Sequence, residues 1–230
     1  MPLPDFAFNP DARIATFAVG HARSPVIVID DAFADPQAIA NYGRTEAAFG
    51  PPPTAYPGLN APVPPQALQP LLDALRPALA GLFPENAPLG TNGYFGLVTL
   101  APATLAPGQT IPHVDNVGDR GLAAVAYLCD PDQGGTGFYR HRATGFERLT
   151  RDTIATYNAA LDFEMRQPRA AAYPVGDHTL FECIGATEAR FNRLTIYNCN
   201  LLHSGQVNPE RLSADPTRGR LTLNLFIAPV

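Results

Sequence analysis

The segment Ile111-Pro112-His113-Val114-Asp115-Asn116 places an imidazole and a carboxylate two positions apart. Side chains alternate faces along an extended strand, so His113 and Asp115 are expected on the same side of the chain. Such a pair supplies two of the three ligands of a facial metal site of the kind that holds non-haem iron. A short motif of this type also occurs without a metal, so the interpretation requires a third ligand.

His203 is the candidate for that third ligand. It follows the run Arg193–Leu202, whose pattern predicts a buried strand, and the end of such a strand can aim a side chain into the mouth of a sheet. The remaining histidines fit other surroundings. His141 lies between two arginines, where we expect the solvated end of a hairpin, and His178 lies in a predicted turn.

The C-terminal run is predicted to be a strand with one polar face. Alternation places Arg220, Thr222, Asn224 and Phe226 on one face, and Leu221, Leu223, Leu225 and Ile227 on the other. A buried guanidinium is costly without a partner, and a bound carboxylate is one possible partner. The alternative is an edge strand whose polar face meets water. Arg218 competes with Arg220 for the same role.

The elements that must position these residues fall into two parts of the chain, an earlier part with two helices and a later part of short strands. Residues 25–31 predict a buried strand, residues 35–49 a helix that Asp35 and Pro36 open, and residues 66–82 a second helix. The proline-rich residues 50–65 predict an extended surface loop. The later part predicts short strands between turn residues, at Tyr94–Leu100, Gln109–Asp115, Gly121–Cys129, Thr136–Tyr139, Thr179–Ile184, Arg193–Leu202 and Arg220–Ile227.

This pattern predicts a mainly β (α+β) fold with a jelly-roll core and flanking helices. We expect a single domain over residues 1–230, with an N-terminal strand and helix elaboration at 1–93 and the core at 94–230. An insertion at about 141–175, with a helix over residues 150–166, interrupts that core. The chain length suits one sizeable core.

Composition excludes several functions. The net charge is −5, and the 16 basic residues are all arginines, which argues against a nucleic-acid-binding protein and excludes lysine chemistry. The three cysteines are odd in number and lack the spacing of a zinc site, as expected of thiols in a reducing compartment. No apolar stretch approaches the length of a membrane span, so we expect a cytoplasmic protein.

Taken in order, His113-Val114-Asp115, then His203, then Arg220-Leu221-Thr222 resemble the motifs of the iron(II)/2-oxoglutarate-dependent oxygenases. Those enzymes carry H-x-D…H for iron and a later R-x-S/T for the cosubstrate on a double-stranded β-helix. The segments 124–129 and 132–139 resemble a hairpin of the prolyl-hydroxylase-like branch. The resemblance covers residues 94–140 and 176–230. The interval between His203 and Arg220 is longer than usual, and the lysine common in that branch is absent, which points to a distinct subfamily.

The resemblance implies Fe(II) bound by His113, Asp115 and His203, and 2-oxoglutarate held by Arg220 and Thr222. Tyr127 and Asn200 are further candidates for contact with the cosubstrate. Because position 115 retains a carboxylate, the resemblance implies hydroxylation and not halogenation. The expected substrate is a small molecule or an amino-acid or peptide side chain, and exposed edge strands allow a homodimer.

Two other functions remain open. A cupin-type enzyme could use the same metal ligands without 2-oxoglutarate, and Arg220 would then belong to a structural ion pair. A non-catalytic jelly-roll binding protein would keep its ligand after His113→Ala.

Overall fold

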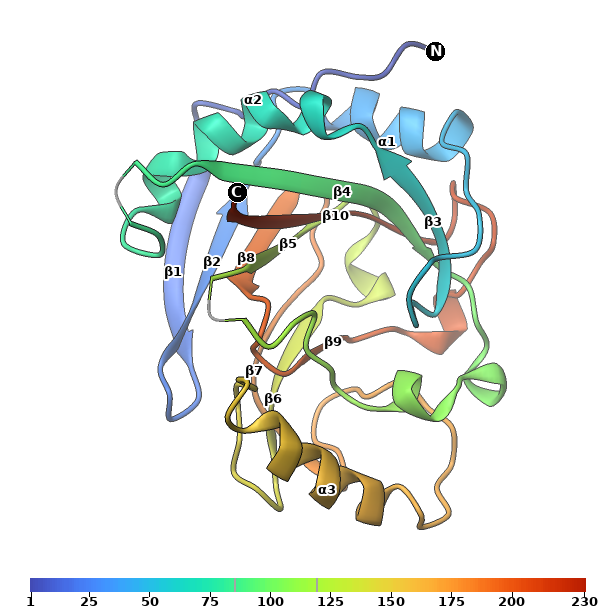
Figure 1. Ribbon diagram of the computed structural model, residues 1–230. Coiled ribbons are helices and arrows are strands. Elements are labelled where there is room, and N and C mark those ends of the chain that lie inside the picture. Colours follow the sequence, from blue (N-terminus) through green and yellow to red (C-terminus); the bar gives the residue numbers. More distant parts are fainter. Residues whose placement is uncertain (85, 119) are drawn as a thin grey trace.

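A computed structural model describes residues 1–84, 86–118 and 120–230. The described residues form two antiparallel sheets that face each other as a jelly roll (Figure 1). The seven-stranded sheet has the order β1 (Arg13–Val19), β2 (Ser24–Asp30), β8 (Arg193–Asn198), β5 (Leu122–Tyr127), β10 (Arg220–Pro229), β4 (Leu89–Val98) and β3 (Gly58–Val63). The three-stranded sheet has the order β7 (Phe181–Thr187), β6 (Thr136–His141) and β9 (His203–Gly205).

Two helices cover the outer face of the larger sheet, α1 (Pro36–Thr45) and α2 (Pro65–Leu75) (Figure 1). The predicted start of α1 is confirmed, because the Asp35 carboxylate accepts a hydrogen bond from the Ala38 amide and Pro36 occupies the first turn. Both helices end earlier than predicted. The chain after α2 tightens into a 3-10 turn at Arg76–Leu79, which contains Pro77.

The main apolar core lies between this sheet and the two helices. The predicted alternation of the C-terminal strand is confirmed. Leu221, Leu223, Leu225 and Ile227 of β10 are buried in this core together with leucines of α2. The opposite face of β10 therefore looks toward the smaller sheet.

The prediction of a loop over residues 50–65 is wrong in part, because Gly58–Val63 forms β3. β3 is the last strand at this edge of the sheet, next to β4, and Pro62 is exposed. An edge strand tolerates proline because the missing N–H would have faced solvent. The prediction also missed β1, which is the other edge strand and is too exposed to show an apolar face in the sequence.

Two predictions about the candidate ligands' strands are also wrong. Residues 109–115 do not form a strand. Pro107–Thr110 is a 3-10 turn, and His113 makes an isolated antiparallel bridge after Pro112, which has no N–H to donate to a ladder. The run Arg193–Leu202 is not one strand either. β8 ends at Asn198, and the chain then turns into the smaller sheet, so that His203 begins β9.

The segment after β6 forms α3 (Ile154–Glu164), as predicted for residues 150–166, and α3 lies beside the smaller sheet (Figure 1). The prediction that His141 lies in solvent is wrong. Its side chain is fully buried, with Nε2 2.8 Å from Glu164 of α3 and Nδ1 2.9 Å from the Thr144 hydroxyl. A histidine between two arginines can therefore be buried when a helix brings it a carboxylate. Among the described residues, no helix is long and apolar enough to cross a membrane.

Candidate metal centre

A backbone bridge brings the two distant histidines together. The N–H of His113 donates to the carbonyl of His203, and the N–H of His203 donates to the carbonyl of His113, both at 2.9 Å. Residues directly opposite in an antiparallel pair project to the same side. The two imidazole rings accordingly lie side by side, with their centroids 4.5 Å apart.

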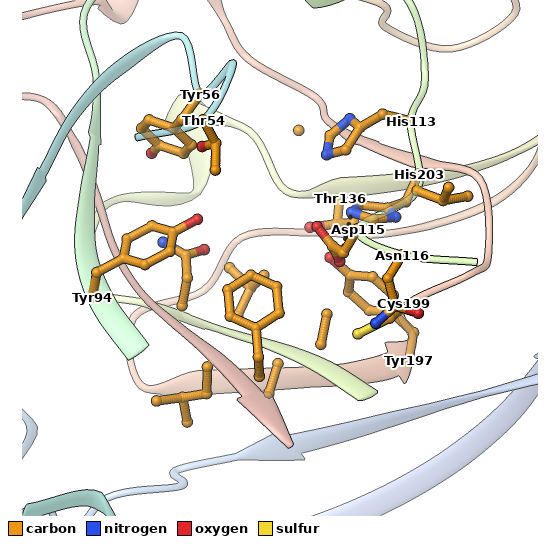
Figure 2. Close-up of a pocket in the computed structure, with 18 of the residues that line it drawn as sticks. Thr54, Tyr56, Tyr94, His113, Asp115, Asn116, Thr136, Tyr197, Cys199 and His203 are labelled. Carbon is orange, nitrogen blue, oxygen red and sulfur yellow. Dashed lines mark ion pairs between the residues drawn. The ribbon is translucent and has the colours of Figure 1, made fainter. Parts of the chain in front are cut away.

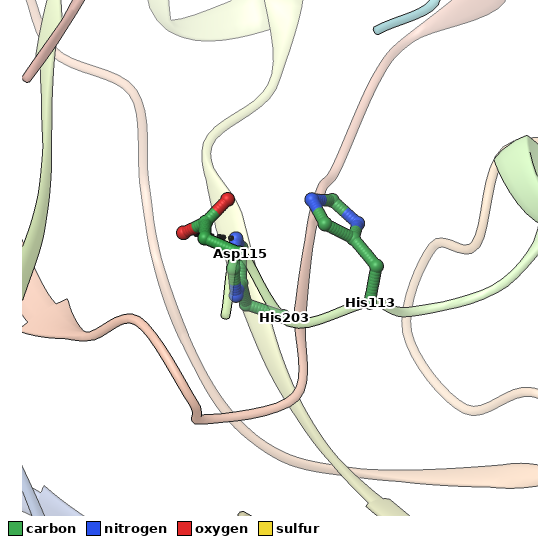
Figure 3. A group of neighbouring side chains, drawn as sticks. All are labelled: His113, Asp115 and His203. Carbon is green, nitrogen blue, oxygen red and sulfur yellow. Dashed lines mark ion pairs between the residues drawn. The ribbon is translucent and has the colours of Figure 1, made fainter. Parts of the chain in front are cut away.

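Asp115 completes the cluster. Its backbone N–H donates to the carbonyl of Cys199 at 2.8 Å, which ties this segment to the chain that leaves β8. Asp115 Oδ2 lies 3.6 Å from His203 Nε2. Each of the three residues offers one ligand atom, and these atoms lie within 4.8 Å of one another. Figure 3 shows the three side chains converging on one point. The structure therefore gathers the three residues that the sequence predicted to share a metal.

Hydrogen bonding determines which nitrogen of His203 faces this point. His203 Nδ1 lies 2.8 Å from the carbonyl oxygen of Leu201. A carbonyl only accepts, so Nδ1 carries the proton and the lone pair is on Nε2, the nitrogen near Asp115. Histidine ligands are commonly oriented in this way by a bond from the other ring nitrogen.

Desolvation within the cavity changes the ionisation of all three groups, although His113 and Asp115 are partly open to solvent. It lowers the pKa of His113 to about 4, an effect that the neighbouring His203 increases, and it lowers the pKa of His203 to about 4. Burial also raises the pKa of Asp115 to about 6, against the influence of His113. Both imidazoles are therefore neutral at neutral pH, as metal ligands must be. Within the described chain, no arginine lies within ion-pair distance of Asp115.

The cluster lines a cavity of about 900 Å³ between the two sheets. In Figure 2 His113, Asp115 and His203 lie on one side of this cavity, and Tyr56 and Tyr94 lie on the other. The larger sheet contributes side chains of β4, β5, β8 and β10, and the smaller sheet contributes side chains of β6 and β9. Cavities of this size accommodate small-molecule ligands.

Arg220 lines the same cavity and is only 6% exposed. Its Nε donates to the carbonyl of Gly134 at 2.8 Å and its Nη2 to that of Gly135 at 2.9 Å, while the guanidinium lies 5.7 Å from the ring centre of Tyr127. No carboxylate of the described residues lies within 4.0 Å of it. Its positive charge is thus buried without a negative partner, which is costly unless an anion binds.

Only glycine fits at positions 134 and 135, whose carbonyls accept hydrogen bonds from Arg220. Gly134 has φ +90°, and a Cβ there would lie 1.7 Å from the Gln206 carbonyl oxygen. A Cβ on Gly135 would lie 1.8 Å from the Thr187 carbonyl oxygen. The two glycines of the connection between β5 and β6 therefore bring two carbonyls close enough to orient the guanidinium.

Four other residues predicted for the site do not line the cavity. Arg218 is exposed and borders a separate, smaller depression. Tyr127 lies behind Arg220, with its hydroxyl 2.7 Å from the Thr136 hydroxyl. Thr222 is fully buried and accepts a hydrogen bond from Asn224 Nδ2. Asn200 is fully buried and accepts a hydrogen bond from Arg148.

Tyr56 lines the cavity although no specific role was predicted for it. Its hydroxyl is buried and makes no hydrogen bond of normal geometry with any described residue, although the Thr222 hydroxyl lies close by. Burial raises the pKa of Tyr56 to about 12, although Arg220 lowers it, so the hydroxyl stays protonated. The proline-rich sequence around Tyr56 indicates a surface loop that could face a substrate, but not a hydroxyl buried near Arg220. Tyr94, in contrast, could have been found from the alternation of β4, whose Phe95 and Leu97 enter the core.

Several solved structures are similar to this fold. HygX from Streptomyces hygroscopicus with iron bound has a TM-score of 0.50 at 13% identity, over 93% of this chain and 88% of that chain. EvdO2 from Micromonospora carbonacea var. aurantiaca has a TM-score of 0.50 at 14% identity, over 94% of both chains. HygX with nickel, 2-oxoglutarate and hygromycin B bound has a TM-score of 0.49 at 14% identity, over 90% of this chain and 84% of that chain.

At these identities the similarity establishes the fold alone. The jelly roll predicted from the sequence is thereby confirmed. No curated protein matches the sequence. A family profile, in contrast, matches residues 10–227, which is nearly the whole chain. The protein therefore belongs to DUF6445, a family of unknown function.

Proposed function

We propose that this protein is an iron(II)- and 2-oxoglutarate-dependent oxygenase that hydroxylates a small molecule or an amino-acid or peptide side chain. One observation carries the proposal. His113, Asp115 and His203 converge in the same cavity in which Arg220 is buried without a negative partner. A metal-ligand cluster and an anion-binding arginine in one cavity match the two requirements of that chemistry.

The residues of the cluster fit iron. Two neutral imidazole nitrogens and one carboxylate oxygen form the donor set of non-haem Fe(II) oxygenases, which leaves positions open for other ligands. The carboxylate of Asp115 is 19% exposed and has only the His203 ring as a polar partner within the described chain, so a cation satisfies it. HygX, which is similar in fold, binds iron.

The residues around Arg220 fit a dicarboxylate such as 2-oxoglutarate. The guanidinium supplies a positive charge, and the Tyr56 hydroxyl on the same cavity supplies a hydrogen-bond donor that makes no hydrogen bond of normal geometry within the described chain. A carboxylate that accepts from both groups would neutralise the arginine and satisfy the tyrosine. Tyr56 thereby takes a role that the sequence motif had suggested for Thr222.

Each residue has a definite task in this proposal. Bound iron and 2-oxoglutarate together supply the activation of dioxygen that the side chains of this chain lack. His113, Asp115 and His203 bind the metal, and the Leu201 carbonyl orients His203. Arg220 and Tyr56 orient the dicarboxylate. Tyr197, whose ring centre lies 4.7 Å from that of His203, excludes water from that side of the cluster.

Two finer features of the proposal rest on fewer residues. Hydroxylation is favoured over halogenation because position 115 keeps a carboxylate. Placement in the prolyl-hydroxylase-like branch is supported by the connection from β5 to β6, where Gly134 and Gly135 position Arg220.

Anaerobic titration of the metal-free protein tests the proposal. We expect Fe(II) followed by 2-oxoglutarate to produce a weak visible charge-transfer band that requires both additions. His203→Ala and Arg220→Ala should each abolish the band. His21→Ala and Arg218→Ala are matched controls outside the cavity and should retain it. A band that survives both cavity substitutions contradicts the proposal. Iron binding without any response to 2-oxoglutarate would instead favour the cupin-type alternative.

A further inference from the structure

The charges around the cavity limit what it can bind. Apart from the histidines of the metal cluster, Asp115 and Arg220 are the only acidic or basic side chains among the described residues that line it. The proposed function, on which this inference rests, assigns the first to the metal and the second to the cosubstrate. A substrate with a carboxylate, phosphate or ammonium group would find no opposite charge left, and burying such a group unpaired is costly.

An aromatic wall lies across the cavity from the metal ligands. The rings of Tyr56 and Tyr94 meet edge to face with centroids 6.0 Å apart, and the rings of Tyr94 and Phe226 are 6.1 Å apart. Figure 2 shows Tyr56 and Tyr94 opposite His113 and Asp115. A wall of this kind packs favourably against the flat or apolar face of a ring.

Asparagine side chains add uncharged hydrogen-bonding groups to the lining. Asn224 donates through Nδ2 to Thr222, and the described chain offers its Oδ1 no partner. Asn116 accepts from the Gly118 amide through Oδ1, which leaves its Nδ2 for other acceptors. The side chain of Asn92 has no hydrogen-bond partner among the residues described. Hydroxyl or amide groups at the edge of a ligand match such side chains.

Small side chains also line the cavity. Gly121, Ala123 and Ala124 line the cavity at and just before β5, so that space remains between the aromatic wall and the metal ligands. A volume of about 900 Å³ is large enough for a dicarboxylate and a drug-sized second molecule together.

We infer that the substrate is an uncharged, ring-bearing small molecule whose edge carries hydroxyl or amide groups. A free amino acid, a nucleotide or a charged peptide does not fit this lining. The ring packs on Tyr94 and Phe226, and its polar edge reaches the asparagines.

Binding of three matched probes to the full-length protein, measured with excess Zn(II) and 2-oxoglutarate so that Asp115 and Arg220 are occupied, tests this inference. The probes are phenyl β-D-glucopyranoside, phenyl β-D-glucuronide and the 6-amino-6-deoxy analogue of the first, which differ only in the charge of one substituent. Saturation-transfer NMR and calorimetry should show that the neutral probe binds at least about tenfold more tightly than either charged probe. Equal or tighter binding of a charged probe, or no binding of the neutral one, overturns the inference.

Two variants locate the bound probe. Phe226→Ala should weaken binding of the neutral probe by about tenfold or more, whereas Phe163→Ala, which removes a 68% exposed ring of α3, should not change it. Asn92→Asp, at an exposed position that does not threaten folding, should shift the preference toward the cationic probe. An unchanged probe preference in Asn92→Asp contradicts the location.

Co(II) binding to the metal-free protein, measured separately, distinguishes failure of this inference from failure of the proposed function. If the neutral probe does not bind while the metal still binds at His113, Asp115 and His203, only the inferred substrate class is wrong. If the metal fails to bind while the neutral probe still does, only the proposed function is wrong.

Discussion

The two faces of β10 show how differently one strand can be used. Leu221, Leu223 and Leu225 are almost fully buried against α1 and α2, in a core that contains only apolar groups. On the other face, Arg220 has no negative partner within the described chain and lies in the same cavity as the unpaired hydroxyl of Tyr56. The first face lowers the free energy of folding. The second retains polar groups that only a ligand satisfies. We therefore expect stability and ligand binding to respond to different substitutions.

Asp115→Ala should have the largest effect of any substitution, and it should affect metal binding without destabilising the fold. It removes the one carboxylate of the metal cluster, so we expect loss of Co(II) binding in visible absorption titrations. The free energy of unfolding of the metal-free protein should change by no more than about 1 kcal/mol, because this carboxylate has few partners in the fold. Undiminished Co(II) affinity would show that the cluster is not the metal site.

Leu223→Ala should destabilise the fold and leave metal binding unchanged. Leu223 is completely buried between the sheet and the helices, so its truncation should lower the free energy of unfolding by about 2–5 kcal/mol in urea. The affinity of the folded fraction for Co(II) should stay unchanged. Phe226→Ala, on the cavity face of the same strand, serves as the comparison and should cost less, because Phe226 is only partly buried. A large loss of metal affinity in Leu223→Ala would break the separation of the two faces.

This separation also explains which parts of the molecule the sequence could predict. Apolar alternation along 221–227 and the proline after Asp35 are local signals, and they predicted the face of β10 and the start of α1 correctly. β3 was not predicted, because its strand character comes from pairing with β4 and not from its own proline-rich residues.

Within the site, residue type and order were enough to single out the three residues that the structure brings together. The bridge between His113 and His203 was not predictable, because it depends on a turn of the chain between the two sheets. The sequence motif placed Thr222 beside the cosubstrate, and Tyr127 was a candidate as a polar residue on a predicted strand. Both lie behind the cavity lining. Tyr56 reaches the cavity only because the β3 edge folds over β4, which no local pattern indicates.

Arg193, in contrast to Arg220, has a carboxylate partner within the described chain. Arg193 of β8 forms a two-pronged pair with Asp30 of β2, with its Nε 2.6 Å and its Nη2 3.1 Å from the carboxylate oxygens. Asp30→Asn should therefore lower the free energy of unfolding by about 1–3 kcal/mol at pH 7 without any effect on ligand binding. Asp73→Asn, at an exposed helix position, is the control and should have little effect.

The ion pair of Arg193 and Asp30 also predicts how the free energy of unfolding depends on pH. The hydrogen bond from Arg193 holds the pKa of Asp30 below its ordinary value. A carboxyl whose pKa is lowered by folding stabilises the protein fully above the unfolded pKa, near 4, and this stabilisation is lost as the pH falls through the lower, folded value. The difference in unfolding free energy between wild type and Asp30→Asn should thus be constant from about pH 5 to 7 and shrink at lower pH. A difference that grows below pH 4 would contradict this origin.

Tyr56→Phe should have the smallest effect, and it tests the comparison most directly. The substitution removes a buried hydroxyl that has no hydrogen-bond partner in the described chain, so the free energy of unfolding should stay the same or rise slightly. The affinity of the Ni(II)-loaded protein for 2-oxoglutarate, measured by calorimetry, should fall by about 0.5–1.5 kcal/mol, the contribution of one hydrogen bond. Tyr42→Phe, which alters a tyrosine packed on the helix-covered side, should leave this affinity unchanged. If Tyr56→Phe instead destabilised the fold and left the affinity intact, its hydroxyl would belong to the structural side of the molecule. The cavity face would then be less dependent on ligands than its unpaired groups indicate.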